Sequence, residues 1–247
     1  MSLQSKISVF GTLFKIAGSF LSRPRPMISL YQRNTLPFVF KDIDFRDFLG
    51  PGFHCRLEMH LAPDTYGDVS SFELLVLSSL VAKFRPRRIF EFGTFMGKTT
   101  QHLAANAPED GQVFTLDLPE SNFETVVSRI PYDKNLLAEG KRKRVGHYFR
   151  ESKFENKIEQ IFANSSEFDE SPYADSMDMV FVDADHTYSS VLNDTRKALH
   201  MLKKEPGKLI LWHDLRQKSD VEKAIADVLG REKVFHIKDT MLAVYAS

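Results

Sequence analysis

From about residue 70 onward, hydrophobic residues alternate between helical spacing and short continuous runs. Helical spacing comes first, from Phe72 to Val81, and we expect that helix to end before Arg85-Pro86, because a residue preceding proline disfavours helical backbone. Runs of strand length follow at Arg88–Phe92, Val113–Leu118, Ile158–Ala163, Met179–Val182 and Leu209–Trp212. Helical stretches separate several of these runs, so the pattern predicts a mostly parallel sheet with helices on both faces.

The last two apolar runs predict a hairpin. Val234–Ile237 and Leu242–Tyr245 are separated by a short polar connection that includes Lys238, Asp239 and Thr240. We expect this hairpin to place at least one antiparallel strand at the edge of the sheet. The whole pattern predicts an α/β fold of the Rossmann-like, doubly wound type, with a mostly parallel seven-stranded sheet and a C-terminal antiparallel hairpin strand.

The first 64 residues differ from the rest and are predicted to form an N-terminal arm or cap on a domain of residues 65–247. Apolar residues from Ile7 to Leu21 recur at helical spacing, which predicts an amphipathic helix. Lys15 interrupts this apolar run, so a signal peptide is disfavoured. We expect the helix to pack on the domain or to form a homo-oligomer contact, with a weak membrane-surface contact as the alternative and no transmembrane segment.

A long connection follows Asp117, because about 40 residues separate it from Ile158, more than a typical loop contains. We therefore expect segment 119–156 to be an insertion or lid that covers or builds a site. The segment contains a basic run at 141–144, which either grips an anionic substrate or forms a solvated face. The same two alternatives apply to the basic residues that follow it, His147, Arg150 and Lys153.

Composition narrows the range of partners. Lys plus Arg and Asp plus Glu number 33 each, so no global field favours nucleic acid. The single cysteine, Cys55, excludes an intrachain disulfide and a thiolate zinc cluster, and it fits a reducing compartment. We expect a cytoplasmic protein whose partner is a small molecule.

A glycine turn, Gly93 to Gly97, lies directly between the first predicted strand of the sheet and a helix. Glycines there allow a tight turn and let a ligand approach the amides at the helix start. Glu91 ends that strand and Asp117 ends the next, where an acid can accept hydrogen bonds from ribose hydroxyls. These features together favour a nucleotide-containing ligand; close packing is the alternative explanation for the glycines.

The same stretch resembles a phosphate-binding P-loop, because Gly97-Lys98-Thr99 ends it. A P-loop has four residues between its glycines, whereas three stand between Gly93 and Gly97. A P-loop-like nucleotide hydrolase is therefore disfavoured, and we expect Lys98 to be a solvated residue at a helix start.

Acids and histidines follow two further strands. Asp183, Asp185 and His186 come after Met179–Val182, and His213 and Asp214 come after Leu209–Trp212. Carboxylates and a histidine from neighbouring strand ends can converge on a divalent cation such as Mg²⁺. His186 or His213 can instead remove a proton from a substrate hydroxyl. The alternative is that the acids cap the helices that follow.

Short polar residues follow the third strand at Asn164, Ser165 and Ser166. Their amide and hydroxyl groups can bond an adenine edge, but such residues are also common in turns.

These motifs resemble a known family. The stretches EFGTFMGKTT, VFTLDL, ANSS, FVDADHTY and LILWHD occur in the order typical of class I S-adenosylmethionine-dependent methyltransferases. FVDADHTY with WHD is most similar to the branch that includes catechol, caffeoyl-coenzyme A and bacterial sugar O-methyltransferases. The resemblance covers about residues 65–247.

The resemblance implies roles for single residues. Gly93 and Gly97 would line the methionine part of S-adenosylmethionine, Thr99 its carboxylate and Asp117 its ribose. Ser165 would lie near adenine, and Asp183 near the amine. The full set expected at the cofactor is Glu91, Gly93, Thr94, Gly97, Thr99, Asp117, Leu118, Asn164, Ser165 and Asp183. In metal-dependent relatives the cation-binding positions correspond to Asp183, His213 and Asp214, although relatives often have an acid or amide where this chain has His213.

The resemblance therefore implies an S-adenosylmethionine-dependent methyltransferase that O-methylates a small hydroxylated acceptor, such as a sugar or a natural-product intermediate. A divalent cation such as Mg²⁺ would lower the pKa of the hydroxyl, and His186 or His213 would take its proton. Two alternatives stand beside this one: the P-loop-like hydrolase, and a non-catalytic binding protein that retains the cofactor fold.

Overall fold

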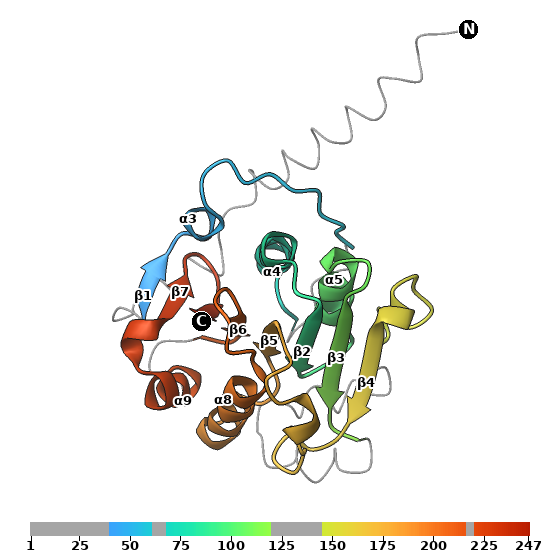
Figure 1. Cartoon of the computed structure of the whole chain (residues 1–247). Coiled ribbons are helices and arrows are strands. Elements are labelled where there is room, and N and C mark those ends of the chain that lie inside the picture. The colour runs from blue at the N-terminus through green and yellow to red at the C-terminus, as the bar shows by residue number, and fades with distance from the viewer. Residues whose placement is uncertain (1–39, 61–67, 120–144, 216–219) are drawn as a thin grey trace, which may run out of the picture. The chain divides into compact units, whose positions relative to one another are not determined.

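Within the described part of the chain, eight strands form one sheet at the centre of the fold (Figure 1). The computed structural model describes residues 40–60, 68–119, 145–215 and 220–247. The strands are β1 (Lys41–Ile43), β2 (Arg88–Phe92), β3 (Gln112–Asp117), β4 (Ile158–Phe162), β5 (Met179–Val182), β6 (Leu209–Trp212), β7 (Val234–Ile237) and β8 (Ala243–Ala246). Their order across the sheet is β1-β7-β8-β6-β5-β2-β3-β4. Strand β8 is antiparallel to β6 and β7, and the other neighbouring strands are parallel.

The predicted α/β architecture is confirmed, because all seven predicted runs form strands. β2, β5, β6 and β7 have the predicted bounds, and the bounds of the other three differ from the predicted ones by one residue. Two details of the prediction were wrong. An eighth strand, β1, comes from the segment predicted as an arm and pairs with β7. The antiparallel strand β8 lies inside the sheet rather than at its edge, because it pairs with β6 as well as with β7.

Helices cover both faces of the sheet (Figure 1). They are α3 (Phe45–Leu49), α4 (Ser71–Phe84), α5 (Lys98–Asn106), α8 (Tyr188–Met201) and α9 (Asp220–Leu229), with single 3-10 turns at Glu155–Lys157, Ser171–Tyr173 and Arg231–Lys233. α4 and α5 pack on one face through residues such as Leu77 and Leu103. α8 and α9 pack on the other through residues such as Ala198 and Ile225. Both faces of the central strands are therefore buried, which explains their continuous apolar sequences.

Helix α4 forms where the sequence predicted a helix. Ser70 and Glu73 form a capping box at its start, with the Ser70 side chain accepting from the Glu73 amide and the Glu73 side chain accepting from the Ser70 amide. The helix ends at Arg85, which has a left-handed conformation with a φ of 49° just before Pro86. The predicted amphipathic helix between Ile7 and Leu21, and residues 120–144 of the predicted insertion, lie outside the described residues.

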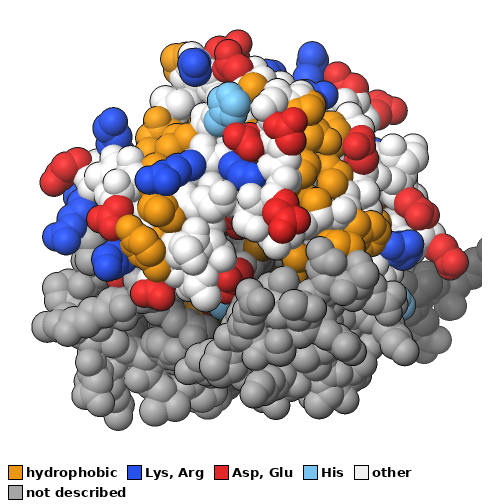
Figure 2. All heavy atoms as spheres, turned by 90° about the horizontal axis from the view of Figure 1, so that it is seen from below, with side chains coloured by type: hydrophobic (Ala, Val, Ile, Leu, Met, Phe, Trp, Pro, Cys, Tyr) orange, Lys and Arg blue, Asp and Glu red, His pale blue; other side chains and the backbone are white. Residues whose placement is uncertain are grey.

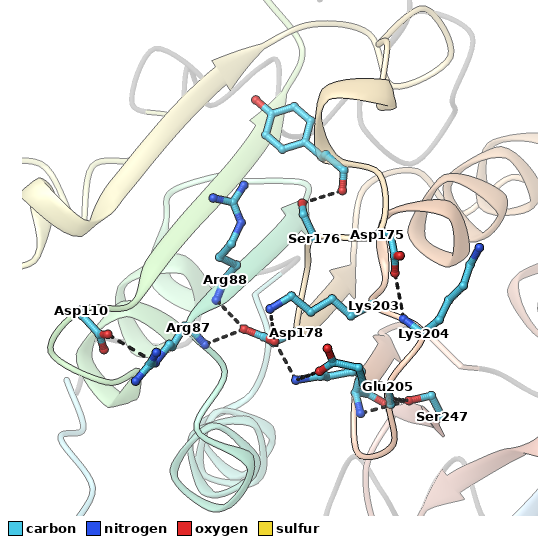
Figure 3. A network of polar contacts seen from close by, with 12 residues as sticks. Arg87, Arg88, Asp110, Asp175, Ser176, Asp178, Lys203, Lys204, Glu205 and Ser247 are labelled. Carbon is cyan, nitrogen blue, oxygen red and sulfur yellow. Dashed lines mark hydrogen bonds and ion pairs between the residues drawn. The ribbon is translucent and has the colours of Figure 1, made fainter.

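A buried carboxylate joins the amino ends of three strands (Figure 3). Asp178, just before β5, accepts hydrogen bonds from the backbone amides of Arg87 and Arg88 at 2.9 and 3.0 Å. Its other oxygen accepts from Lys203 and Lys208 at 2.9 and 2.8 Å. Burial raises the pKa of Asp178, but these donors outweigh it and lower the pKa to about 2. The network holds the start of β2, β5 and β6 together, at the opposite end of the sheet from the predicted site.

The described surface carries both signs of charge. On the face shown in Figure 2, acidic and basic side chains are interspersed with hydrophobic ones. Phe162, at the end of β4, is an exposed aromatic residue. None of the helices within the described ranges is long and apolar enough to cross a membrane.

Candidate active site

The predicted site residues gather at the carboxyl ends of neighbouring strands. Strands β6, β5, β2 and β3 are adjacent and parallel, so the segments that follow them share one edge of the sheet. Glu91 and the glycine turn come from β2, Asp117 from β3, Asp183 from β5, and the His213-Asp214 pair from β6. In open α/β sheets this edge is where ligands bind.

Gly93 is required by close packing. Its φ is +94°, and a Cβ at this position would lie 2.1 Å from the backbone oxygen of Asp183. A clash with backbone cannot be relieved by a side-chain rotation, so only glycine fits where the chain after β5 crosses the turn. Gly97, the N-cap of α5, has a φ of +78°, and a Cβ there would lie 2.6 Å from the Phe149 ring. Packing therefore accounts for both glycines, whether or not a ligand also uses the turn.

Asp117 holds the glycine turn against β3. Its Oδ2 accepts a 2.8 Å hydrogen bond from the Phe95 amide, and its Oδ1 accepts a 2.7 Å hydrogen bond from the Leu118 amide. The Asp117 side chain is buried. A carboxylate oxygen can accept more than one hydrogen bond.

Glu91 is a fully buried acid. Its Oε2 accepts hydrogen bonds from Thr100 at 2.5 Å and from Thr115 at 2.6 Å, while Oε1 is buried and has no hydrogen-bond partner among the described residues. Burial raises the pKa of Glu91 to about 8; the threonine hydroxyls oppose this rise, and the negative charges of Asp183 and Asp117 add to it. The carboxyl is therefore mostly neutral at pH 7, with one oxygen that a polar ligand group would satisfy.

Thr94 and Thr99 are also buried. The Thr94 hydroxyl lies 2.7 Å from that of Thr115 and accepts from Gln160 at 3.0 Å, and Thr99 lies in the first turn of α5. Lys98 was wrongly predicted to be solvated. It is 4% exposed, and its Nζ lies 3.8 Å from the buried carboxylate of Asp68, so its charge is paired rather than solvated.

The loop after β4 contains a side-chain turn. Asn164 Oδ1 accepts from the amide and hydroxyl of Ser166 at 3.1 and 2.9 Å, which is the turn-forming alternative considered for this segment. The backbone oxygen of Ser165 accepts a 3.1 Å hydrogen bond from Asn193 on α8. Ser165 is half-buried, so its hydroxyl lies on a loop held by a helix.

His213 lies at the centre of a cluster of carboxylates. Its Nδ1 is 3.3 Å from Asp183 Oδ1 and 3.5 Å from Asp214 Oδ2, and its Nε2 is 3.3 Å from Glu73 Oε2. Asp183, His213 and Asp214 each offer a ligand atom, and these atoms lie within 4.8 Å of one another. The Nδ1 of the half-exposed His186 is 3.2 Å from Asp214 Oδ2. The structure thus brings together the residues predicted as metal ligands and the residues predicted as bases.

The charged groups of this cluster shift one another's pKa values. Burial lowers the pKa of His213, but the carboxylates of Asp183, Asp214 and Glu73 outweigh it and raise the pKa well above its usual value. Burial raises the pKa of Glu73, but hydrogen bonding and the charge of His213 overcome it and bring the pKa to about 2. Burial is also the largest effect on Asp183 and raises its pKa. These carboxylates therefore favour the protonated form of the His213 imidazole.

Asp185 does not join the cluster. Its Oδ2 accepts from the hydroxyls of Thr187 and Ser190 at 2.8 and 2.6 Å, which fixes it beside the start of α8. It does not cap that helix, as the alternative interpretation of these acids expected, because the N-cap is Thr187 and no side chain caps it. Lys153 binds Glu58, and the side chain of Arg150 donates to the Val145 backbone oxygen. The basic run at 141–144 lies outside the described residues.

Glu73 was not identified from the sequence. The spacing of Ser70 and Glu73 before an apolar run is the signal of a capping box, and it would have predicted the start of α4. It gives no sign of the contact with His213, which lies 140 residues further along the chain.

The glycine turn, Asp117 and the His213 cluster share the edge of a Rossmann-like sheet at which ligands commonly bind. A family profile described as a methyltransferase domain matches residues 90–215, just over half of the chain, and this segment contains every site residue predicted from the sequence. The chain belongs to this methyltransferase-domain family. The predicted class, an S-adenosylmethionine-dependent methyltransferase, is thereby confirmed. No curated protein matches the chain.

Solved structures share the fold. An O-methyltransferase from Bacillus cereus, in complex with SAH, is 17% identical, with 74% of this chain and 84% of that chain covered and a TM-score of 0.51. A protein from Staphylococcus aureus, provisionally assigned as a caffeoyl-CoA O-methyltransferase, is 19% identical, with 73% and 85% covered and a TM-score of 0.51. Cofactor-bound Rv0187 from MTB is 17% identical, with 72% and 81% covered and a TM-score of 0.50. At these identities the likeness supports the fold alone.

Proposed function

We propose that the chain transfers a methyl group from S-adenosylmethionine to a hydroxyl oxygen of a small acceptor, such as a sugar or a natural-product intermediate. The observation that carries the proposal is the pairing of His186 with Asp214, beside the glycine turn and Asp117 at the same edge of the sheet. A histidine held by a carboxylate is suited to removing a hydroxyl proton. The O-methyltransferases among the similar structures support oxygen as the acceptor atom.

The cofactor would bind across the carboxyl ends of β5, β2, β3 and β4. Asp117 would accept hydrogen bonds from ribose hydroxyls, and the unpartnered Oε1 of Glu91 suits a polar group of the same ligand. The backbone around Thr94 and Thr99 would receive the methionine part. Adenine would lie near Leu118, Asn164 and Ser165, and the amine near Asp183.

His186 is the proposed base. Its Nδ1 faces Asp214 at 3.2 Å, so Nε2 is the nitrogen that would take the acceptor's proton, and Asp214 would stabilise the resulting imidazolium. The acceptor oxygen forms a bond to the methyl carbon as the bond from that carbon to sulfur breaks, and the sulfur leaves as a neutral sulfide. His213 is buried with carboxylates at both nitrogens, which makes it poorly placed for this role.

The donor set also fits a divalent cation. Asp183, His213 and Asp214 would hold it, because their ligand atoms converge and lie within 4.8 Å of one another. Such an ion would lower the pKa of the acceptor hydroxyl when bound.

Ligand-dependent thermal stability and methyl transfer test the proposal together. We expect S-adenosylmethionine and its demethylated product to raise the melting temperature of the full chain, whereas ATP with Mg²⁺ should not. Labelled methyl groups should then pass to members of a panel of sugars and phenols. A shift with ATP alone would support the P-loop-like hydrolase. A shift with S-adenosylmethionine but no transfer across a broad panel would support a non-catalytic binding protein.

A further inference from the structure

The orientation of His213 is fixed by a carboxylate that is not one of the candidate metal ligands. Glu73, on α4, is 3% exposed, and its Oε2 lies 3.3 Å from Nε2 of His213. The other ring nitrogen, Nδ1, faces Asp183 and Asp214 at 3.3 and 3.5 Å. Nε2 thus faces the buried carboxylate of Glu73, and Nδ1 faces the carboxylates of Asp183 and Asp214.

Glu73 is itself held firmly. Its Oε2 accepts hydrogen bonds from the amide and hydroxyl of Ser70 at 3.0 and 2.7 Å, and its Oε1 accepts one from the Met241 amide at 2.6 Å. These donors come from the start of α4 and from the turn between β7 and β8. The carboxylate therefore cannot swing away without breaking contacts to two separate elements.

A small cavity adjoins the cluster. It has a volume of about 10 Å³, and its lining includes Asp183, His186, His213, Trp212, Val191 and Val221. A space of this size admits one water molecule or a single ion. The cavity lies beside two of the three candidate ligands, Asp183 and His213.

A histidine that ligates a metal donates its other N–H to a carboxylate or carbonyl in most proteins, which fixes both the tautomer and the ring orientation. Glu73 and His213 have this relationship. We propose that the site binds a first-row transition ion such as Mn²⁺ in preference to Mg²⁺, through Asp183, Asp214 and Nδ1 of His213, with Glu73 as the positioning residue. This inference rests on the metal-assisted form of the proposed function.

The imidazole nitrogen sets the preference between ions. Mg²⁺ takes oxygen ligands, whereas Mn²⁺, Co²⁺ and Zn²⁺ accept nitrogen and bind mixed sites of nitrogen and oxygen more tightly. Two aspartates alone would predict Mg²⁺. With the nitrogen of His213 as a third ligand, we expect a transition ion instead.

Direct metal binding tests the proposal without relying on activity. Free Mn²⁺ in mixtures with metal-stripped full-length protein can be followed by its paramagnetic resonance signal, with Mg²⁺ as competitor. We expect Mn²⁺ to bind and to resist a large excess of Mg²⁺. Glu73→Gln should weaken Mn²⁺ binding about 10- to 100-fold, because an amide that donates to Nε2 places the imidazole proton on Nδ1, where the metal would bind.

Two further variants keep the result interpretable. Ser70→Ala removes a hydroxyl bonded to Glu73 but leaves the contact with His213, so it should lower the melting temperature and leave Mn²⁺ affinity unchanged. His213→Asn can offer an amide oxygen to the cluster and an N–H to Glu73, so it should reduce the preference for Mn²⁺ over Mg²⁺. This second variant tests the preference even if Glu73→Gln fails to fold.

Three outcomes would overturn the proposal: equal affinity for Mg²⁺ and Mn²⁺, unchanged Mn²⁺ binding in a folded Glu73→Gln variant, or no binding of any divalent ion. Binding of S-adenosylmethionine, measured on the same samples, separates these failures from failure of the methyltransferase proposal. A protein that binds the cofactor but no metal retains the proposed function and loses only its cation.

Discussion

The carboxylate of Asp117, at the end of β3, accepts a 2.8 Å hydrogen bond from the backbone amide of Phe95, within the glycine turn that follows β2. One side chain thus shapes the turn and faces the proposed ribose position. Asp117→Ala should lower the affinity for S-adenosylmethionine at least about 10-fold, because it removes a charged hydrogen-bond acceptor. Calorimetric titration with the cofactor measures this. Asp110→Ala, an exposed aspartate just before β3, serves as the control and should bind like the unmodified chain.

Gly93 and Gly207 provide a matched pair for backbone packing. Both have positive φ, +94° and +81°, but a Cβ at Gly93 would lie 2.1 Å from Asp183 backbone oxygen, whereas nothing lies within 4 Å of a Cβ at Gly207. Gly207→Ala should cost about 1–2 kcal/mol of unfolding free energy, the strain of a left-handed alanine. Gly93→Ala should cost clearly more and weaken cofactor binding. Urea unfolding measures both, and equal losses would contradict the packing argument.

The central strands were predictable because both of their faces are buried. Strands such as β5 (MVFV) and β6 (LILW) are apolar at every position, a pattern typical of strands that are buried on both faces. β1 has the sequence KDI, in which Lys41 and Asp42 are exposed and Ile43 is partly buried against the core, so its place beside β7 depends on backbone pairing that leaves little hydrophobic pattern. The position of β8 inside the sheet likewise depends on its pairing with the distant β6.

The site was predictable as far as strand ends determine it. Asp117, Asp183, His213 and Asp214 follow adjacent parallel strands, so their convergence follows from the topology. Glu73 lies on a helix that packs across the sheet, and its contact with His213 spans 140 residues. Contacts of that kind depend on how a helix is placed, which periodicity alone does not specify.

Glu91 should make the ligand-free protein less stable as the pH rises. Its pKa in the folded chain is raised to about 8 from an ordinary value of 4.5, so the folded state holds a proton that the unfolded state releases. This contribution is fully present below pH 4.5 and is lost as the pH rises through 8, by up to about 1.4 kcal/mol per pH unit. Urea unfolding of Glu91→Gln, which cannot ionise, should show a weaker loss over this range. Parallel profiles for the two proteins would rule out a neutral Glu91.

Asp178 should contribute to stability without affecting the site. Removing its carboxylate leaves two backbone amides and two lysines without their acceptor, so Asp178→Ala should cost about 2–4 kcal/mol of unfolding free energy. The pKa of Asp178 is lowered from 3.8 to about 2, so its contribution is present above pH 3.8 and lost as the pH falls through 2. Denaturant unfolding measures the loss. The affinity for S-adenosylmethionine should stay unchanged, because the network lies at the amino ends of the strands.

His186 and His200 allow a matched test of the proposed base. Both side chains are 52% exposed and both pair with a carboxylate, Asp214 at 3.2 Å and Glu170 at 3.1 Å, but only His186 lies at the carboxyl ends of the strands. His186→Gln should lower kcat about 100- to 10,000-fold with little change in cofactor affinity, the usual loss when a general base is removed. His200→Gln should leave kcat unchanged. Steady-state methyl transfer measures both, and a fully active His186→Gln enzyme would mean that another group, or water, takes the acceptor's proton.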